Sequence, residues 1–274
     1  MELARPYTAA FASRFLLMLQ YRAAAFAGFL TQCWWGGIKV MVYAAFFRGA
    51  TVTAPITLSQ VITYTWLAQA FLALAPWGCD PDVALAVRNG SVGYDRLRPV
   101  DNYGLWYARA AGWMTSRAIP RAALMFLFAG VALPLAGLAD WSWAPPPSVA
   151  QALLFAVSLP FVVTLSSAMV MLLNIAVVAI LNDRGVNSLL SPLVIVFSGN
   201  LIPLTIFPDW MHVALFVQPF AGLVDIPFRI YTGNLTGGAA WAGIALQALW
   251  TIVIVALGRA WMARVMRRLA MQGG

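Results

Sequence analysis

Long runs without a charged residue restrict the fold of this chain more than any other feature. The run from Trp141 to Asn182 spans 42 residues, and none of them is charged. A helix needs about 20 consecutive apolar residues to cross a bilayer. The chain of 274 residues is 62% hydrophobic and only 9% charged, whereas about a quarter of the residues in a soluble domain are charged. The sequence therefore predicts an all-α polytopic membrane protein.

Six apolar runs are long enough to be membrane spans of a single transmembrane domain covering residues 1–274. The run at 149–181 contains Pro160, which predicts either one long kinked helix or a helix followed by a re-entrant piece. We favour the single helix. The six predicted spans are residues 23–47, 56–77, 118–139, 149–181, 186–206 and 236–258.

The basic residues give the expected orientation, because cytoplasmic loops of membrane proteins carry an excess of Lys and Arg. With both termini in the cytoplasm, 14 of the 17 basic residues fall on the cytoplasmic side of the six spans. Only Arg48 and Arg229 face outward, and Lys39 lies within the first span. We therefore interpret the net charge of +8 as orientation in the cytoplasmic (inner) membrane and not as a sign of nucleic-acid binding.

Two segments outside the spans have a pattern of their own. Residues 5–20 carry aromatic and apolar side chains every four positions, which predicts an amphipathic helix lying in the inner membrane interface; the alternative is a simple extension of the first span. Residues 207–234 are too rich in proline to cross the membrane and too apolar for a solvated loop. We expect them to form short helices that dip into the outer leaflet and are buried in protein or line a cavity.

Residues 79–101 form a charged island in an otherwise apolar chain, and contain seven of its 26 charged residues. Asp80 can cap a helix that starts at Pro81 and closes at Gly90, over residues 81–89. A second short helical segment is predicted over 91–97, before Pro99. The island can be a docking surface for a partner, or an ordinary polar loop that only sets the topology.

A few polar residues lie within or beside the predicted spans. Lys39 and Asn174 are the most embedded, and both are candidates for a translocation path; Lys39 can instead snorkel outward, and Asn174 can hydrogen-bond one helix to another. Arg109, Arg117 and Arg121 interleave with tryptophan and tyrosine as in an inner-interface belt. Arg117 and Arg121 share a helix face and can contact anionic lipid or substrate headgroups, of which lipid anchoring is the simpler interpretation.

The chain lacks the residues that most membrane machines need for chemistry of their own. A P-loop requires Lys followed by Ser or Thr, but the sole lysine, Lys39, precedes a valine. No acid falls inside a predicted span, which disfavours ion coupling through a carboxylate. The single histidine, His212, has no cluster of metal-ligating or nucleophilic residues around it in the sequence. We therefore predict no catalytic residue and no metal site.

Two segments resemble ABC-2 type transporter permeases, the membrane subunits of ATP-binding-cassette exporters. The first is RNGSVGYDRLRPVDNYGLWYARAAG at 88–112, similar to the inner loop of that family. The second is SGNLIPLTIFPDWMHVALFVQPFAGLVDIPFRIYTGN at 198–234, similar to one six-span subfamily. Its matching positions are Gly199, Ile202, Pro203, Leu204, Phe207, Pro208, Trp210, Pro219, Phe220, Pro227 and Gly233.

The resemblance implies a permease subunit that works as a dimer with an identical or related chain, and that recruits a separate cytoplasmic ABC ATPase. ATP and Mg would be bound by that subunit, so this chain would hold no cofactor and be no enzyme by itself. The loop at 79–107 would be the coupling loop, although relatives carry a longer apolar residue at Tyr94-Asp95, so which short helix docks stays open. Its implied ATPase contacts are Asp82, Arg88, Tyr94, Asp95, Arg96 and Arg98, and the implied cap of the exit consists of Phe207, Pro208, Trp210 and Pro219.

The predicted function is export of a hydrophobic or amphipathic substrate, such as a lipid, a lipid-linked glycan, a modified peptide or a drug-like metabolite. Membrane lipids are expected partners, and nucleic acid is not. One alternative is an ATP-independent secondary transporter or channel with six spans. Another is a membrane-embedded enzyme or an assembly factor, which would require a reactive constellation that the sequence does not display.

Overall fold

The computed structural model describes residues 4–49, 55–97 and 99–272, without the side chains of Arg22, residues 95–97, Leu189 and residues 268–272. Every regular element in these ranges is a helix. Three of them are long and apolar enough to cross a membrane: Asn102–Leu135, Val149–Ile180 and Gly237–Arg267. The described part of the chain is thus an all-α fold with the character of a membrane protein.

The centre of the fold is α7 (Val149–Ile180), which packs against α11 (Gly237–Gln272) and α5 (Asn102–Leu127). Of the most apolar 18-residue window in each spanning helix, 72% is buried in α7 but only 28% in the other two. Ser148 caps α7, and the helix continues without a break through Pro160. One helix, and not a helix with a re-entrant piece, therefore occupies this run.

The helix that contains the third predicted span, 118–139, begins well before that span, at Asn102. Asp101 caps it by accepting a hydrogen bond from the Gly104 amide (3.0 Å). The helix then continues through the π turn η4 (Phe128–Ala132) and α6 (Leu133–Leu135). Residues 102–107 therefore belong to α5 and not to the loop at 79–107. Arginines on a helix face do not end a helix, so charge marked the wrong boundary.

The second and fifth predicted spans are shorter as helices than the sequence indicated. α3 (Leu58–Ala70) gives way to the 3-10 turn η2 (Leu72–Leu74). Ala75 is extended because Pro76 follows it. α8 (Asp183–Phe197) stops at Ser198, before Gly199 with φ +87°. In contrast, α2 (Arg22–Gly49) covers its run, while α11 extends well past residue 258.

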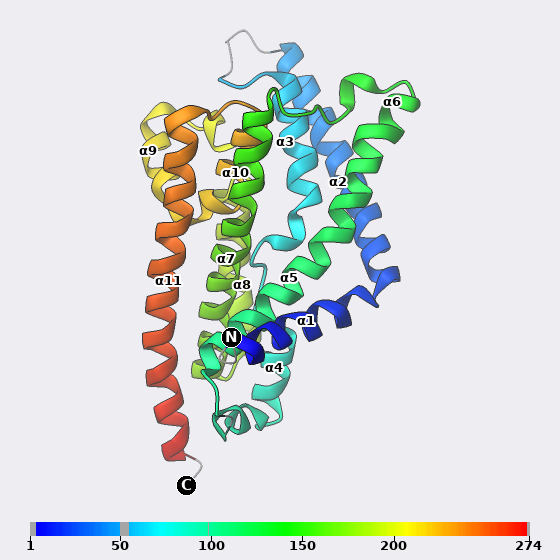
Figure 1. Cartoon of the computed structure of the whole chain (residues 1–274). Helices are drawn as coiled ribbons and strands as arrows, with labels where there is room; N and C mark the ends of the chain where they lie inside the picture. Colours follow the sequence, from blue (N-terminus) through cyan, green and yellow to red (C-terminus); the bar gives the residue numbers. More distant parts are fainter. Residues whose placement is uncertain (1–3, 50–54, 98, 273–274) are drawn as a thin grey trace.

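The N-terminal helix α1 (Arg5–Leu19) is separate from α2, so it does not extend the first span. It crosses the end of the bundle and packs on α5 (Figure 1). Its predicted apolar stripe is only half-buried, against α5 of the same chain. Gly112 permits the contact, because a Cβ there would lie 2.5 Å from the carbonyl oxygen of Phe11. The stripe therefore serves internal packing as well as any interface.

Four short elements connect α8 and α11: η6 (Leu204–Ile206), α9 (Asp209–Val217), η7 (Pro219–Leu223) and α10 (Asp225–Tyr231). α10 is buried, and its Phe228 stacks edge-on against Tyr64 of α3. In Figure 1, α9 lies at the end of the bundle opposite α4 (Pro81–Arg88), while both chain termini lie toward the α4 end. The fold thus has two distinct ends.

Candidate functional site

The charged island folds into two short helices, which we call the ledge (residues 80–97). α4 begins at Pro81, and the Asp80 carboxylate caps it by accepting from the Asp82 amide (2.9 Å). Gly90, with φ +74°, turns the chain after the helix. The 3-10 helix η3 (Ser91–Leu97) follows. The helices expected over 81–89 and 91–97 are therefore both observed, the second as a 3-10 helix.

The inner face of the ledge is apolar and packs on the bundle. Val83 and Ala84 are buried. Val83 joins a cluster with Trp106 of α5 and Met171 of α7, and Ala84 joins a cluster with Val177 of α7. Burial of this face fixes which side of α4 is left free.

Arg14 of α1 lies behind the ledge and binds two of its acids. Its Nη2 is 3.0 Å from Asp80 Oδ1, and its Nη1 contacts Asp82 Oδ2. Arg109 of α5 donates to Asp82 Oδ2 over 3.1 Å. The Arg14 and Asp80 side chains are only 8% and 2% exposed, so their attraction is weakly screened. These ion pairs join the start of α4 to α1 and α5.

Further polar contacts tie the ledge and the residues before it to α7 and α8. The Asn174 side chain of α7 accepts a hydrogen bond from the Asp80 amide (2.8 Å). Asn187 of α8 accepts a hydrogen bond from the Cys79 amide (2.9 Å). Burial raises the pKa of the Cys79 thiol. Arg88 lies 3.6 Å from Asp183 at the start of α8. Together with the ion pairs of Arg14 and Arg109, these contacts join the ledge and Cys79 to four helices, α1, α5, α7 and α8.

The outer face of the ledge is exposed and partly apolar, and its Arg88 reaches Asp183 of α8 at one edge. Leu85 is 57% exposed and Tyr94 71% exposed, and the Arg88 side chain is 64% exposed. Pro81, Leu85 and Arg88 recur at the spacing of one helix face. Sequence reasoning missed Leu85. Its helical spacing from Pro81 and Arg88 could have placed it on the face opposite the buried pair Val83-Ala84.

The structure divides the predicted ATPase contacts into two groups. Arg88 and Tyr94 face outward, whereas Asp82 is engaged by Arg14 and Arg109. Arg98 lies outside the described residues, as do the side chains of Asp95 and Arg96. Asp82 is therefore placed to hold the ledge, and not to leave its carboxylate free for a partner.

The two candidates for a translocation path do not meet. Lys39 Nζ donates to the backbone oxygen of Asn200 (2.6 Å) and contacts its Oδ1 (3.3 Å), so it joins α2 to the segment after α8. Asn174 accepts a hydrogen bond from the Asp80 amide. It therefore joins α7 to the start of α4, which is the role predicted for it as the alternative to a translocation path. Both side chains are used in internal contacts.

A buried acid that sequence reasoning missed lies at the other end of the bundle. Asp225 is fully buried and accepts from the Leu204 amide (2.9 Å) and from Arg229 Nη1 (3.2 Å). The Tyr64 hydroxyl donates to the Gly199 carbonyl (3.0 Å) and lies 3.4 Å from Asp225 Oδ1. The charge count over predicted spans could not find this site, because Asp225 belongs to the connecting segment.

The four predicted cap residues are in diverse environments. Trp210 is 81% exposed and Pro208 is exposed, while Phe207 and Pro219 are half-buried. The Phe207 carbonyl lies 2.6 Å from the imidazole Nε2 of His212. Only part of this set therefore packs against the bundle.

Arg109 is ion-paired, whereas no acid pairs with Arg117 or Arg121 among the described residues. Within the same residues no group of three His, Cys, Asp or Glu side chains could hold a metal ion.

No protein-family model matches the chain, and no curated protein or solved structure matches it either.

Proposed function

We propose that this chain is the permease subunit of an ATP-binding-cassette exporter, and that the ledge receives a separate cytoplasmic ATPase. The substrate would be hydrophobic or amphipathic and would cross the cytoplasmic membrane. The resemblance of residues 88–112 and 198–234 to ABC-2 permeases supports this. The observation that carries the proposal is the two-sided ledge, which is exposed on one face and bound to α1, α5 and α7 by the other.

The geometry suits transmission of a rigid-body movement. An ATPase that grips Leu85, Arg88 and Tyr94 would displace α4. The buried pair of Arg14 and Asp80 would carry the displacement to α1, and the hydrogen bond from Asp80 to Asn174 would carry it to the central helix α7. Packed elements move as units and do not deform continuously. Of the two short helices, α4 is therefore our choice for the main docking element.

The proposed topology has six spans, with both termini cytoplasmic. α2, α5 with α6, α7 and α11 would each cross the membrane. α3 with η2, and α8 with the segment after it, would complete the six as broken helices, which membranes tolerate where the irregular backbone is buried in protein. The position of α4 and both termini toward one end of the bundle supports this (Figure 1). α9 and α10 would lie in the outer leaflet, and a second permease chain would complete the path.

The test is co-purification with a co-expressed candidate ATPase of this family, combined with ATPase stimulation. Leu85→Asp and Arg88→Glu should each reduce both, because they place a charge of the wrong kind on the free face of α4. Arg264→Glu is the matched control, since Arg264 is an exposed arginine at the far end of α11. Full co-purification and stimulation of the Leu85→Asp/Arg88→Glu double variant would refute docking on α4.

The buried pair of Asp225 and Arg229 favours one competing function, an ion-coupled secondary transporter. Against this, the Asp225 carboxylate is already bound by Arg229 and by the Leu204 amide, as in a structural site. The two functions differ in their energy source. Transport that survives ATP depletion and is lost in Asp225→Asn would support coupling through this acid, whereas transport that stops on ATP depletion supports the exporter.

A further inference from the structure

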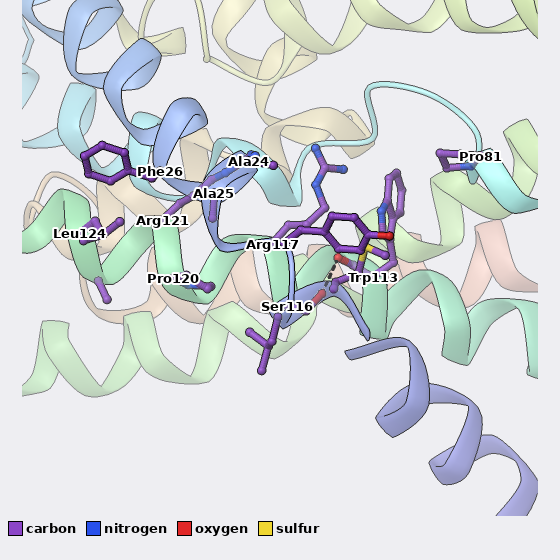
Figure 2. Close-up of a pocket in the computed structure, with 14 residues that line it drawn as sticks. Ala24, Ala25, Phe26, Pro81, Trp113, Ser116, Arg117, Pro120, Arg121 and Leu124 are labelled. Carbon is purple, nitrogen blue, oxygen red and sulfur yellow. Dashed lines mark hydrogen bonds between the residues drawn. The ribbon is translucent and has the colours of Figure 1, made fainter. Parts of the chain in front are cut away.

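A cavity of about 830 Å³ opens between the end of α1, the start of α2 and the middle of α5. Its volume is in the range typical of ligand sites. Most of its lining is apolar, including Leu19 of α1, Phe26 of α2 and Leu124 of α5. Figure 2 shows Phe26 and Leu124 toward one end and Trp113 and Pro81 toward the other, with Arg117 and Arg121 between them. The cavity is thus an apolar groove with a cationic centre.

The two arginines have no counter-charge among the side chains that the structure describes. Arg117 and Arg121 are half-buried, and no acid pairs with either among the described residues. The guanidinium of Arg117 lies 4.8 Å from the centre of the Trp113 ring. Arg121 packs on the bare backbone of Gly28, where a Cβ would lie 2.8 Å from its Nη2. Its Nε is buried without a hydrogen-bond partner.

This arrangement is costly without an anion. An arginine stays protonated in proteins, and partial burial of an unpaired charge is unfavourable. Arg117 and Arg121 are also four residues apart on one helix, where like charges repel. In contrast, the buried Arg14 and the half-buried Arg109 are each paired with an acid of the ledge. An anion between the two free guanidinium groups would relieve both the repulsion and the unsatisfied donor.

We propose that this cavity binds an anionic phospholipid, with its phosphate between Arg117 and Arg121 and an acyl chain along Phe26 and Leu124. Guanidinium groups bind phosphate with paired hydrogen bonds. The apolar lining would pack against an acyl chain, whereas a free anion would leave this lining uncovered. All residues of the site belong to this chain, so lipid binding can be tested separately from docking of an ATPase.

Native mass spectrometry of the full chain in mild detergent tests the proposal. The probe is an equal mixture of phosphatidylglycerol and phosphatidylcholine with the same acyl chains. The wild type should retain phosphatidylglycerol preferentially. Arg117→Gln/Arg121→Gln should lower that preference about tenfold or more, because two charge-assisted contacts are lost. Arg264→Gln/Arg267→Gln removes the same charge from exposed positions of α11 and should leave it unchanged.

Two further arms separate a lipid site from a site for free phosphate and from misfolding. Ala24 lines the cavity and is exposed on α2, so Ala24→Phe fills space without displacing the core. It should reduce retention of both lipids while both arginines remain. The proposal is overturned if the chain binds inorganic phosphate but retains neither phospholipid, if Ala24→Phe retains both lipids fully, or if the arginine double variant keeps the wild-type preference.

Discussion

Replacing Arg14 by methionine should destabilise the protein far more than loss of a surface arginine would. The change leaves the Asp80 carboxylate, only 2% exposed, without its counter-charge. Removing one partner of a buried ion pair costs about 3–5 kcal/mol. Asp80 keeps its bond from the Asp82 amide, and the contact of Arg14 with Asp82 adds little, since Asp82 is 43% exposed and such pairs contribute at most about 1 kcal/mol. We therefore expect Arg14→Met to lower the free energy of unfolding by about 3 kcal/mol.

The double variant Arg14→Met/Asp80→Asn isolates the pair. Asparagine caps a helix about as well as aspartate, and methionine fills much of the volume of arginine, so both charges disappear without a large cavity. Arg14 Nε also has no partner in its buried position, which the double variant removes. The double variant should recover most of the loss, with a coupling energy of at least about 2 kcal/mol.

Unfolding in mixed micelles titrated with SDS, followed by tryptophan fluorescence, measures these differences. Ser13→Ala is the control, because Ser13 is exposed on the same helix. If Arg14→Met costs no more than Ser13→Ala, or the double variant is as unstable as Arg14→Met, the ion pair does not hold α1 to the ledge and the proposed transmission to α1 fails with it.

Three other predictions test the packing around the ledge. Gly112→Ala should cost about 1–3 kcal/mol by overpacking and speed hydrogen exchange in α1, because its Cβ would press on the Phe11 backbone; unchanged exchange would contradict the close contact. Asn174→Leu leaves the Asp80 amide unsatisfied and should cost about 1–3 kcal/mol in the same SDS titration, and a neutral result would show that this amide finds another partner. Burial raises the pKa of the Cys79 thiol, so maleimide labelling, measured by peptide mass, should be slow at neutral pH, faster as the pH rises and complete on denaturation; rapid labelling of the folded protein at neutral pH would argue against its burial.

Local signals predicted local structure well. Asp80 followed by Pro81 marked the start of α4, and Gly90 its end, because a cap and a left-handed turn depend on neighbouring residues only. The uncharged run after residue 148 likewise predicted α7. Helix ends beside charged residues were predicted less well, as the early start of α5 at Asn102 illustrates.

Contacts between distant segments could not be predicted from one sequence. Arg14 and Asp80 are 66 residues apart, and nothing in either segment identifies the other as its partner. The prediction therefore placed Arg14 on an interface helix and assigned Asp82 to the ATPase. Asp225 was missed because it lies in the connecting segment, outside the spans over which acids were counted, and its contact with Tyr64 joins residues 161 positions apart. Composition identifies a charge, but only the fold determines whether it is paired.

One face of α5 connects the ledge to the proposed lipid site. Arg109, Trp113, Arg117 and Arg121 recur every four residues over about 18 Å of helix, with Arg109 bound to Asp82 at one end. Pro81, the first residue of α4, also lines the cavity proposed to bind lipid. A lipid bound there would contact α4, the proposed docking helix, directly. By linkage, it changes the response to an ATPase only if it binds more tightly in one position of α4 than in another. Arg117→Gln/Arg121→Gln should then alter ATPase stimulation without reducing co-purification, whereas Leu85→Asp should reduce both.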